Sequence, residues 1–167
     1  IDHIEFIDPR CYKLGKKIFL KKELKDDFVE KNQMKVVDFD IYRELMIKNL
    51  VPYAPEDLTT NKSLLLENNF ERNNAIDWNK GCYIGQEITA RMKYRALLKK
   101  RIYSLNLKKG SPNIQQTIKE EKNEYGKIIN VKNKSVLAML KIDLATKKIN
   151  SKQLIKTDDG IVLDFIT

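Results

Sequence analysis

Apolar and polar residues alternate in short blocks along the first part of the chain. Residues 1–37 contain two brief apolar runs, 3–7 and 16–22, and charged or turn-forming residues bound each run, which is typical of strands. Residues 41–49 then place apolar side chains with helical spacing behind an aspartate that can cap a helix, and Pro52 ends the pattern. The pattern predicts short strands followed by one helix.

The middle of the chain changes from an irregular connector to a second helix. Residues 54–78 show no hydrophobic period and are rich in Asn and Thr. A connector of this length is unusual in a compact domain unless it lines a site. From Gly85 to Tyr94, apolar residues recur at every fourth position, which predicts a helix. The residues just before Gly85 therefore lie where a long connector meets a helix N-terminus.

From residue 99 onward the pattern has the two-residue period of strands. Strands are predicted at 101–108, 124–131, 135–142, 152–157 and 160–166. Asp159-Gly160 is a strong signal for a hairpin turn, and we expect the polar stretch 108–124 to be a loop. Short strands at this spacing indicate a small antiparallel barrel or sandwich. The fold class is therefore α+β, with strands and helices over 1–97 and a small β-structure over 98–167.

The composition allows a folded core and narrows the class of protein. Hydrophobic residues make up 42% of the 167 residues and charged residues 33%, so the chain can bury a core and carry a solvated surface. No apolar run is long enough to span a bilayer, and the first residues lack the basic and apolar regions of a signal peptide. We expect a cytoplasmic protein without a membrane partner. Because the chain begins with Ile1 rather than Met, we expect it to be part of a longer protein.

The net charge of +9 has two explanations. It would attract an anionic partner such as a nucleic acid, a polyglutamylated cofactor or a membrane surface. Alternatively, the excess of Lys over Arg and the many Ile and Asn residues reflect an AT-rich genome, and Arg, the better reader of phosphate, is not enriched. Two cysteines and one histidine cannot supply the four ligands of a structural zinc site, so no metal site is predicted. Cys82 alone could lend one ligand to a shared metal or cluster.

The segment KGCYIGQEITAR, residues 80–91, concentrates reactive groups. Gly81 and Gly85 flank Cys82 and permit turns with positive φ, so Cys82 is expected near a helix N-terminus, with Lys80 two residues before it. The helix dipole and the cation both favour the thiolate. A buried cysteine that acts as a small hydrophobic residue fits the same pattern, so both interpretations stay open at this point.

Polar side chains on the following helix are a second candidate feature. Gln86 and Glu87 fall in the first turn, where they can pair with a planar heterocycle or cap the helix. Glu87, Arg91 and Arg95 are spaced by four, which puts two guanidinium groups on one face that suits a carboxylate or phosphate. A surface salt bridge between Glu87 and Arg91 explains the same spacing without a ligand.

The twelve residues 80–91 match the signature K-G-C-[FY]-x-G-Q-E-x-x-[AS]-R. In this segment the chain resembles the YgfZ family, folate-binding relatives of the glycine-cleavage T-protein. Weaker similarity surrounds the motif, in DPR at 8–10 with LG at 14–15, and in VP at 51–52 with DL at 57–58. The resemblance therefore covers most of the chain, thinly at its ends.

The resemblance implies both a fold and a role. It implies a partial T-protein-like folate-binding body before the small C-terminal antiparallel β-barrel, tetrahydrofolate as ligand, and a part in the assembly or repair of iron–sulfur proteins. The location would be cytoplasmic, or the mitochondrial matrix in a eukaryote. Cys82 is the residue it marks for chemistry, and Glu67 falls where the family has an acid or amide. The expected ligand-binding residues are Lys80, Gly81, Gly85, Gln86, Glu87, Arg91, Arg95 and Glu67. The expected partners are folate and iron–sulfur client or assembly proteins.

Two other functions stay open. A folate-dependent aminomethyltransferase needs a general acid or base near the folate nitrogen, for which Glu67 and Glu87 are candidates. An RNA-binding barrel needs a charged groove and stacked aromatic rings. The barrel region has only Tyr103, Tyr125 and Phe165 as aromatic residues and no dense Arg cluster. We therefore expect a non-enzymatic assembly factor rather than an enzyme, and nucleic acid is not the expected partner.

Overall fold

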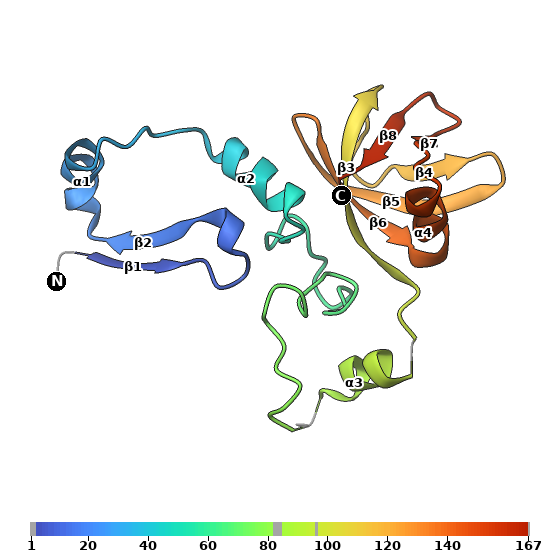
Figure 1. Ribbon diagram of the computed structural model, residues 1–167, viewed down its shortest axis with the longest axis horizontal. Coiled ribbons are helices and arrows are strands. Elements are labelled where there is room, and N and C mark those ends of the chain that lie inside the picture. The colour runs from blue at the N-terminus through green and yellow to red at the C-terminus, as the bar shows by residue number, and fades with distance from the viewer. Residues whose placement is uncertain (1–2, 82–84, 96, 167) are drawn as a thin grey trace.

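A two-stranded hairpin forms the N-terminal end of the molecule (Figure 1). The computed structural model describes residues 3–81, 85–95 and 97–166. Strand β1 (His3–Ile7) pairs antiparallel with β2 (Lys16–Leu20), so that His3 lies opposite Leu20 and Ile7 opposite Lys16. The short 3-10 helix η1 (Tyr12–Leu14) is part of the segment that connects the two strands. Both strands predicted for this region are confirmed.

A short helix follows the hairpin, where the sequence had predicted only strands. The 3-10 turn η2 (Lys22–Leu24) leads into α1 (Lys25–Lys31). Acidic residues occupy the first turn of α1 and a lysine its last turn, which complements the helix dipole. The ring of Phe28 packs edge-on against His3, with 4.9 Å between the ring centroids, and ties the helix to β1. The expectation of strands alone up to residue 37 was therefore wrong.

Helix α2 (Phe39–Lys48) joins the N-terminal hairpin to the larger sheet. Asp38 caps it, because its side chain accepts a hydrogen bond from the backbone nitrogen of Asp40 at 2.7 Å. Ile47 is fully buried and packs against the sheet residues Ile102 and Leu137. The predicted helix and its aspartate cap are confirmed, and its C-terminal half contacts the sheet.

A long connector without regular secondary structure follows α2, as the sequence predicted. Between α2 and α3 (Glu87–Tyr94), turns and bends are the only local structure in the described residues. The connector is nevertheless anchored, since the backbone nitrogen of Ile102 donates to the carbonyl of Glu67 at 2.8 Å. Leu66 and Asn69 are buried nearby. The connector thus packs along the sheet instead of extending into solvent.

The C-terminal part is an antiparallel, barrel-like sheet of six strands in the order β4-β5-β6-β3-β8-β7. Its elements are β3 (Lys100–Lys109), β4 (Thr117–Glu120), β5 (Asn123–Lys132), β6 (Ser135–Lys141), α4 (Ile142–Asn150), β7 (Ile155–Lys156) and β8 (Val162–Phe165). The two edges approach each other, because the backbone nitrogen of Asp158 donates to the carbonyl of Lys119 at 3.0 Å. The sheet is therefore nearly closed, and the predicted α+β class with a small antiparallel barrel is confirmed.

Two elements of this sheet region were not predicted. Strand β4 lies inside the stretch 108–124, which the sequence had assigned to a loop, so that assignment was wrong. Ile118 is the one aliphatic residue of this strand, and it is 1% exposed in the main core. Helix α4 follows β6 directly and buries Ala145. Strand β4 escaped prediction because its single inward side chain gives too weak a period to identify a strand.

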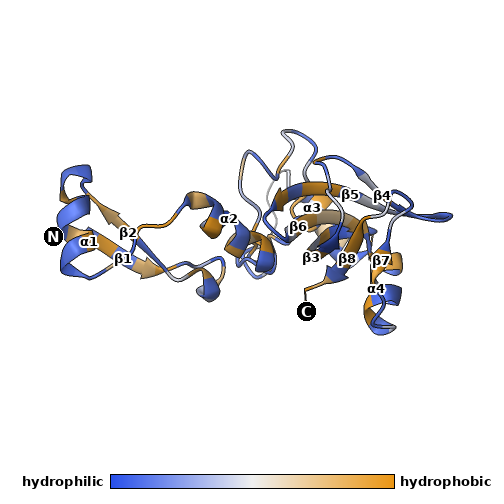
Figure 2. Ribbon diagram, turned by 90° about the horizontal axis from the view of Figure 1, so that it is seen from above, coloured by the Kyte–Doolittle hydropathy of each residue, from blue (hydrophilic) through white to orange (hydrophobic). Residues whose placement is uncertain are grey.

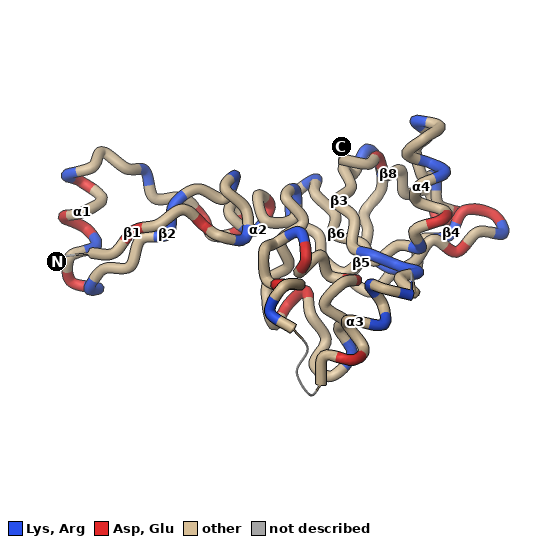
Figure 3. The backbone as a smooth tube through the Cα atoms, turned by 60° about the horizontal axis from the view of Figure 1, so that its bottom comes forward, with Lys and Arg blue, Asp and Glu red and all other residues tan. Residues whose placement is uncertain are grey.

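The apolar side chains of the sheet gather in one core, and charged residues are distributed over the rest of the surface. Leu105, Ile128, Leu140 and Leu163 are fully buried in this core. Figure 2 shows apolar residues along the strands of the sheet, and Figure 3 shows Lys and Arg spread over both ends of the molecule.

None of the helices in the described part of the chain has the length and hydrophobicity needed to cross a membrane. A T-protein-like body and a boundary at residue 97 stay predictions.

Candidate functional site

The glycine-flanked motif lies between the connector and α3. Lys80 and Gly81 are exposed at its start, and Gly85 is exposed at its end. Gly81 has a φ of 81° and Gly85 a φ of 100°, so both occupy the left-handed region that glycine permits. This agrees with the turns expected on either side of the cysteine. The predicted catalytic residue, Cys82, lies outside the described residues.

Helix α3 carries the polar residues of the motif. Gln86 precedes the helix and is buried, at 6% exposure. Glu87 and Arg91 form an ion pair across one helical turn, and their side chains are 71% and 56% exposed. Arg95 is exposed at the C-terminal end of the helix. The predicted pair is present, and its exposure means that it contributes only a few tenths of a kcal/mol to the helix.

Side chains that the sequence analysis missed fasten α3 to the connector. Glu71 forms an ion pair with Lys93 and accepts a hydrogen bond from the indole nitrogen of Trp78 at 3.1 Å. The ammonium of Lys93 also lies 4.8 Å from the centroid of the Trp78 ring, and Tyr94 packs edge-on against that ring. The hydrogen bond from Lys93 is the main reason why the pKa of Glu71 is lowered. These contacts fix the helix that carries the second part of the motif.

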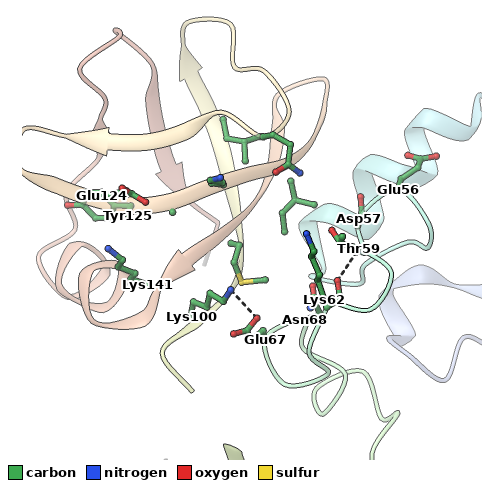
Figure 4. A pocket seen from close by; sticks show the side chains of 17 residues that line it. Glu56, Asp57, Thr59, Lys62, Glu67, Asn68, Lys100, Glu124, Tyr125 and Lys141 are labelled. Carbon is green, nitrogen blue, oxygen red and sulfur yellow. Dashed lines mark hydrogen bonds and ion pairs between the residues drawn. The ribbon is translucent and has the colours of Figure 1, made fainter. Parts of the chain in front are cut away.

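A cleft of about 360 Å³ opens where the connector meets the sheet (Figure 4). Connector residues including Thr59 and Lys62 form one wall, and strands β3, β5 and β6 form the other. Glu67 lines this cleft and is 7% exposed, and its carboxylate lies 3.5 Å from the ammonium of Lys100. Figure 4 shows Lys100 and Lys141 on the sheet side, with Glu67 on the connector side. We call this space the Glu67 cleft.

Two lysines of the Glu67 cleft lie directly opposite each other in the sheet. Lys100 of β3 is the cross-strand partner of Lys141 of β6, and both line the cleft. Like charges in this position destabilise an antiparallel pair. Glu67 offsets this repulsion at Lys100 alone, because its carboxylate has an ion-pair contact with Lys100 and none with Lys141 in the described structure. The cleft is also lined by Glu56, Asp57 and Glu124, so an anionic group would be favoured beside the two paired lysines rather than throughout the cleft.

The residues expected to bind one ligand do not all meet in one place. Glu67 is the only member of that set among the described residues that line the cleft. Arg91 lies on α3 and Arg95 directly follows it, and both are exposed. Resemblance alone had pointed to Glu67 and to a basic stretch over 99–101, which contains Lys100, and nothing in the sequence had pointed to Lys141. That these two lysines are neighbours could have been found only from the pairing of β3 with β6.

Metal-binding groups are sparse in the part of the chain that the structure describes. No cluster of three or more His, Cys, Asp or Glu side chains is arranged there to hold a metal ion. The described thiol, Cys11, is partly exposed, and its sulfur lies 3.9 Å from the side-chain oxygen of Asn49. A metal or cluster bound through Cys82 would therefore need ligands from another molecule or from outside the described residues.

Comparison with known proteins finds relatives that are named as iron–sulfur cluster assembly factors. A relative from Mycosarcoma maydis, named iron–sulfur cluster assembly factor IBA57 homolog, is 33% identical over 101 residues. The relative of the same name from Dictyostelium discoideum is 30% identical over 100 residues, and the IBA57 of Mus musculus is 31% identical over 100 residues. The chain is a homologue of the IBA57 factors. No family model matches the chain.

The similarity to the IBA57 factors covers 58–60% of this chain. It covers 24% of the fungal and slime-mould relatives and 27% of the mouse relative, so the chain matches about a quarter of their length. IBA57 is the eukaryotic counterpart of the YgfZ family, so the resemblance found in the motif is confirmed. The names of these relatives place them in mitochondria.

Proposed function

We propose that this chain is part of a tetrahydrofolate-binding factor that assists the assembly or repair of iron–sulfur proteins. The observation that carries the proposal is homology to proteins named iron–sulfur cluster assembly factors, at 30–33% identity over about 100 residues. The KGCYIGQEITAR segment supports it, because this segment combines a cysteine with flanking glycines and a nearby cation. The partners would be iron–sulfur client or assembly proteins, and the location the mitochondrial matrix if the source is eukaryotic.

Cys82 would act as a ligand to the iron–sulfur cargo. Glycines on both sides of it adopt positive φ, and Lys80 lies two residues before it. A positive charge and a following helix N-terminus favour the thiolate, which is the form that binds iron. Four ligands are the norm for a cluster, so a client, an assembly partner or a second copy would supply the others. The role is therefore transfer by ligand exchange rather than permanent binding.

Tetrahydrofolate fits the chemistry of the Glu67 cleft. Its pterin ring carries N–H donors, which a carboxylate such as Glu67 can accept in a partly buried site. Met139 and Ile128 supply apolar surface beside that carboxylate, and the volume of about 360 Å³ lies in the range of small-molecule sites. When bound, tetrahydrofolate supplies a reduced ring with a nucleophilic nitrogen. The chain itself would orient the ring and exclude water.

The lysines of the Glu67 cleft suit the other end of the same ligand. The glutamate tail of folate carries carboxylates, and Lys100 and Lys141 lie side by side in the β3–β6 ladder. A carboxylate between them would relieve the repulsion between two adjacent ammonium groups. Arg91 and Arg95 were the residues first expected to bind the tail. They do not line the Glu67 cleft, whereas Lys100 and Lys141 do, so the cleft lysines are the better candidates.

A titration with reduced folate tests the ligand. Tetrahydrofolate is added to the chain under anaerobic conditions, and binding heat is measured for the wild type, for Glu67→Gln and for Lys141→Gln. We expect saturable binding that each variant weakens about tenfold, since each removes one charge-assisted contact. Glu121→Gln, at an exposed turn, serves as the control and should bind like the wild type. Unchanged affinity in both cleft variants would place the ligand elsewhere.

A complementation experiment tests the assembly role. Cells that lack their own IBA57-type factor receive the full-length protein with either Cys82 or Cys82→Ser, and activities of iron–sulfur enzymes are measured. We expect rescue by the wild type and loss of rescue by Cys82→Ser, because a hydroxyl is a poor ligand for iron. Cys11→Ser controls for the loss of a thiol as such. Full rescue by Cys82→Ser would remove the cysteine from the proposal.

The aminomethyltransferase alternative makes a different prediction. It needs a general acid or base within hydrogen-bond reach of the folate nitrogen, and Glu67 is the candidate carboxylate from the sequence that lines the cleft. Turnover of an aminomethyl donor that Glu67→Gln abolishes would favour this alternative. Rescue in cells without such turnover would favour the assembly factor.

A further inference from the structure

A second cleft, separate from the Glu67 cleft, combines positive charge with aromatic surface. It has a volume of about 600 Å³ and lies between the segment after β1, the end of α2, the connector and the sheet. Four cations line it: Arg10, Lys13, Lys48 and Arg72. No Asp or Glu is among the described residues that line it. We call it the basic cleft.

The cations of the basic cleft are only partly neutralised. Arg10 binds the buried carboxylate of Asp8, and Lys48 pairs with Glu44 across one turn of α2. Lys13 and Arg72 have no ion pair or hydrogen bond with any described residue. At least two positive charges are therefore available to a ligand, and two more add to the local potential. Such a concentration of charge suits a ligand with several negative charges.

Aromatic and apolar side chains also line the basic cleft. Tyr103 of β3 packs edge-on against Phe165 of β8, with 5.8 Å between ring centroids and 82° between ring planes. Both line the cleft, together with Ile149 of α4. Aromatic side chains accept the flat face of a heterocycle by stacking or edge contact. The cleft therefore offers aromatic surface for a planar ring and several cations for anionic groups.

A buried hydroxyl in the same cleft has no partner among the described residues. Ser104 follows Tyr103 in β3, lines the basic cleft and is 3% exposed. Its hydroxyl makes no hydrogen bond with any described residue. A buried hydroxyl without a partner costs about 1–3 kcal/mol, so such groups are usually satisfied by a water or a ligand. This hydroxyl is therefore a candidate partner for a ligand that enters the basic cleft.

We propose that the basic cleft binds a small aromatic phosphate ester of the nucleotide class. Arginine and lysine together with an aromatic surface are what such a ligand requires, since its phosphates need several cations and its base needs a flat apolar surface. A carboxylate ligand of low charge would leave most of the cations unused. The proposal does not depend on folate binding, because the two clefts share no lining residue.

Calorimetry on the full chain tests the proposal with ATP, tripolyphosphate and adenosine as probes. We expect saturable binding of ATP that weakens as salt is raised. Adenosine and tripolyphosphate should each bind at least tenfold more weakly, since each lacks one half of the ligand. Absence of saturable ATP binding at millimolar concentration, or equal affinity for ATP and tripolyphosphate, would overturn the proposal. Tighter binding of tetrahydrofolate than of ATP, sensitive to Arg72→Gln, would also overturn it.

Variants locate the binding in the basic cleft. Lys13→Gln and Arg72→Gln should each weaken ATP binding about tenfold, because each removes a charge-assisted contact. Tyr103→Leu and Phe165→Leu should each weaken binding of ATP more than that of tripolyphosphate. Ser104→Ala should lower the affinity for ATP without lowering the melting temperature, which a purely structural hydroxyl would not do. Lys122→Gln, exposed at the β4–β5 turn, is the matched charge control. Equal ATP affinity in the wild type and Arg72→Gln would move the site elsewhere.

Discussion

One guanidinium nitrogen of Arg43 donates to both carboxylate oxygens of Asp57, at 2.8 and 2.9 Å. Both side chains are almost fully buried, at 1% and 0% exposure. Asp57 also accepts hydrogen bonds from the backbone nitrogen of Tyr53 at 2.8 Å and from the side chain of Asn130 at 2.6 Å. A single carboxylate therefore links α2, the connector and β5. This link positions the connector wall of the Glu67 cleft, which Asp57 itself lines.

The buried pair predicts a large effect of one substitution. Asp57→Asn removes the charge that balances Arg43 in the interior, and breaking a buried ion pair costs about 3–5 kcal/mol. We expect the free energy of unfolding, measured with urea, to fall by that amount. Glu56→Gln is the matched control, because Glu56 lies 3.6 Å from the same guanidinium but is 47% exposed. It should change stability by less than about 1 kcal/mol. Equal effects of the two variants would contradict a buried pair.

Asp8 predicts a loss of stability in acid. Its side chain is 1% exposed, and the hydrogen bonds that it accepts from Arg10 lower its pKa from the ordinary value of 3.8 to about 2. Because the folded-state pKa is below the unfolded one, this stabilisation is complete above about pH 4 and is lost as the pH falls towards 2. It amounts to about 2 kcal/mol.

The test of Asp8 is the pH dependence of unfolding. Urea titrations between pH 2 and about pH 6 should show a shallower decline in Asp8→Asn than in the wild type. Asp26→Asn, on the exposed first turn of α1, is the control and should follow the wild-type curve. Identical curves for the wild type and Asp8→Asn would mean that another carboxyl group causes the acid sensitivity.

Two glycines with positive φ predict different costs for the same substitution. Gly126 of β5 has a φ of 151°, and an added Cβ would lie 1.9 Å from the carbonyl oxygen of Met139 in β6. Gly160 has a φ of 87°, but an added Cβ would meet no atom within 4 Å. We expect Gly126→Ala to lower the free energy of unfolding by about 3 kcal/mol or more, since two backbones must separate. Gly160→Ala should cost about 1–2 kcal/mol, from backbone strain alone. Similar costs at both positions would contradict the close approach of β5 and β6.

The local signals in the sequence predicted most of the elements. The Asp38 cap and the apolar spacing after it identified α2, and the two-residue period identified β3, β5, β6 and β8. Asp159-Gly160 marked the β7–β8 turn, where Gly160 has positive φ. These features depend on residues that are close in the sequence. Local chemistry therefore suffices to find them.

The remaining features depend on contacts between distant residues. Lys100 and Lys141 are 41 positions apart and become neighbours only through the register of β3 and β6. Asp57 meets Asn130 across 73 positions, and no pattern in either segment indicates the contact. Helix α1 and strand β4 are short and mostly polar, so tertiary contacts such as those of Ile118 decide their structure. The motif was recognised from its residues, whereas the clefts could not be.

The contacts of Glu71 predict that it positions the motif helix α3. Glu71→Gln would lose the ion pair with Lys93, and the hydrogen bond from Trp78 would become weaker. Trp78 is the single tryptophan of the chain, so its emission reports on this region alone. We expect a red shift of the emission in Glu71→Gln and faster hydrogen exchange in α3. Since these contacts are partly exposed, global stability should fall by no more than about 1 kcal/mol.

Acidification of the wild type should reproduce the effect of Glu71→Gln. The pKa of Glu71 is lowered mainly by the hydrogen bond from Lys93, so the contacts persist below the pH at which an ordinary glutamate is protonated. The emission of Trp78 should therefore shift only in more acidic solution, and this transition should be absent in Glu71→Gln. Glu121→Gln, at an exposed turn, should keep the wild-type transition. A transition that persists in Glu71→Gln would show that the contact with Trp78 does not depend on the carboxylate charge, and α3 would then be held by packing alone.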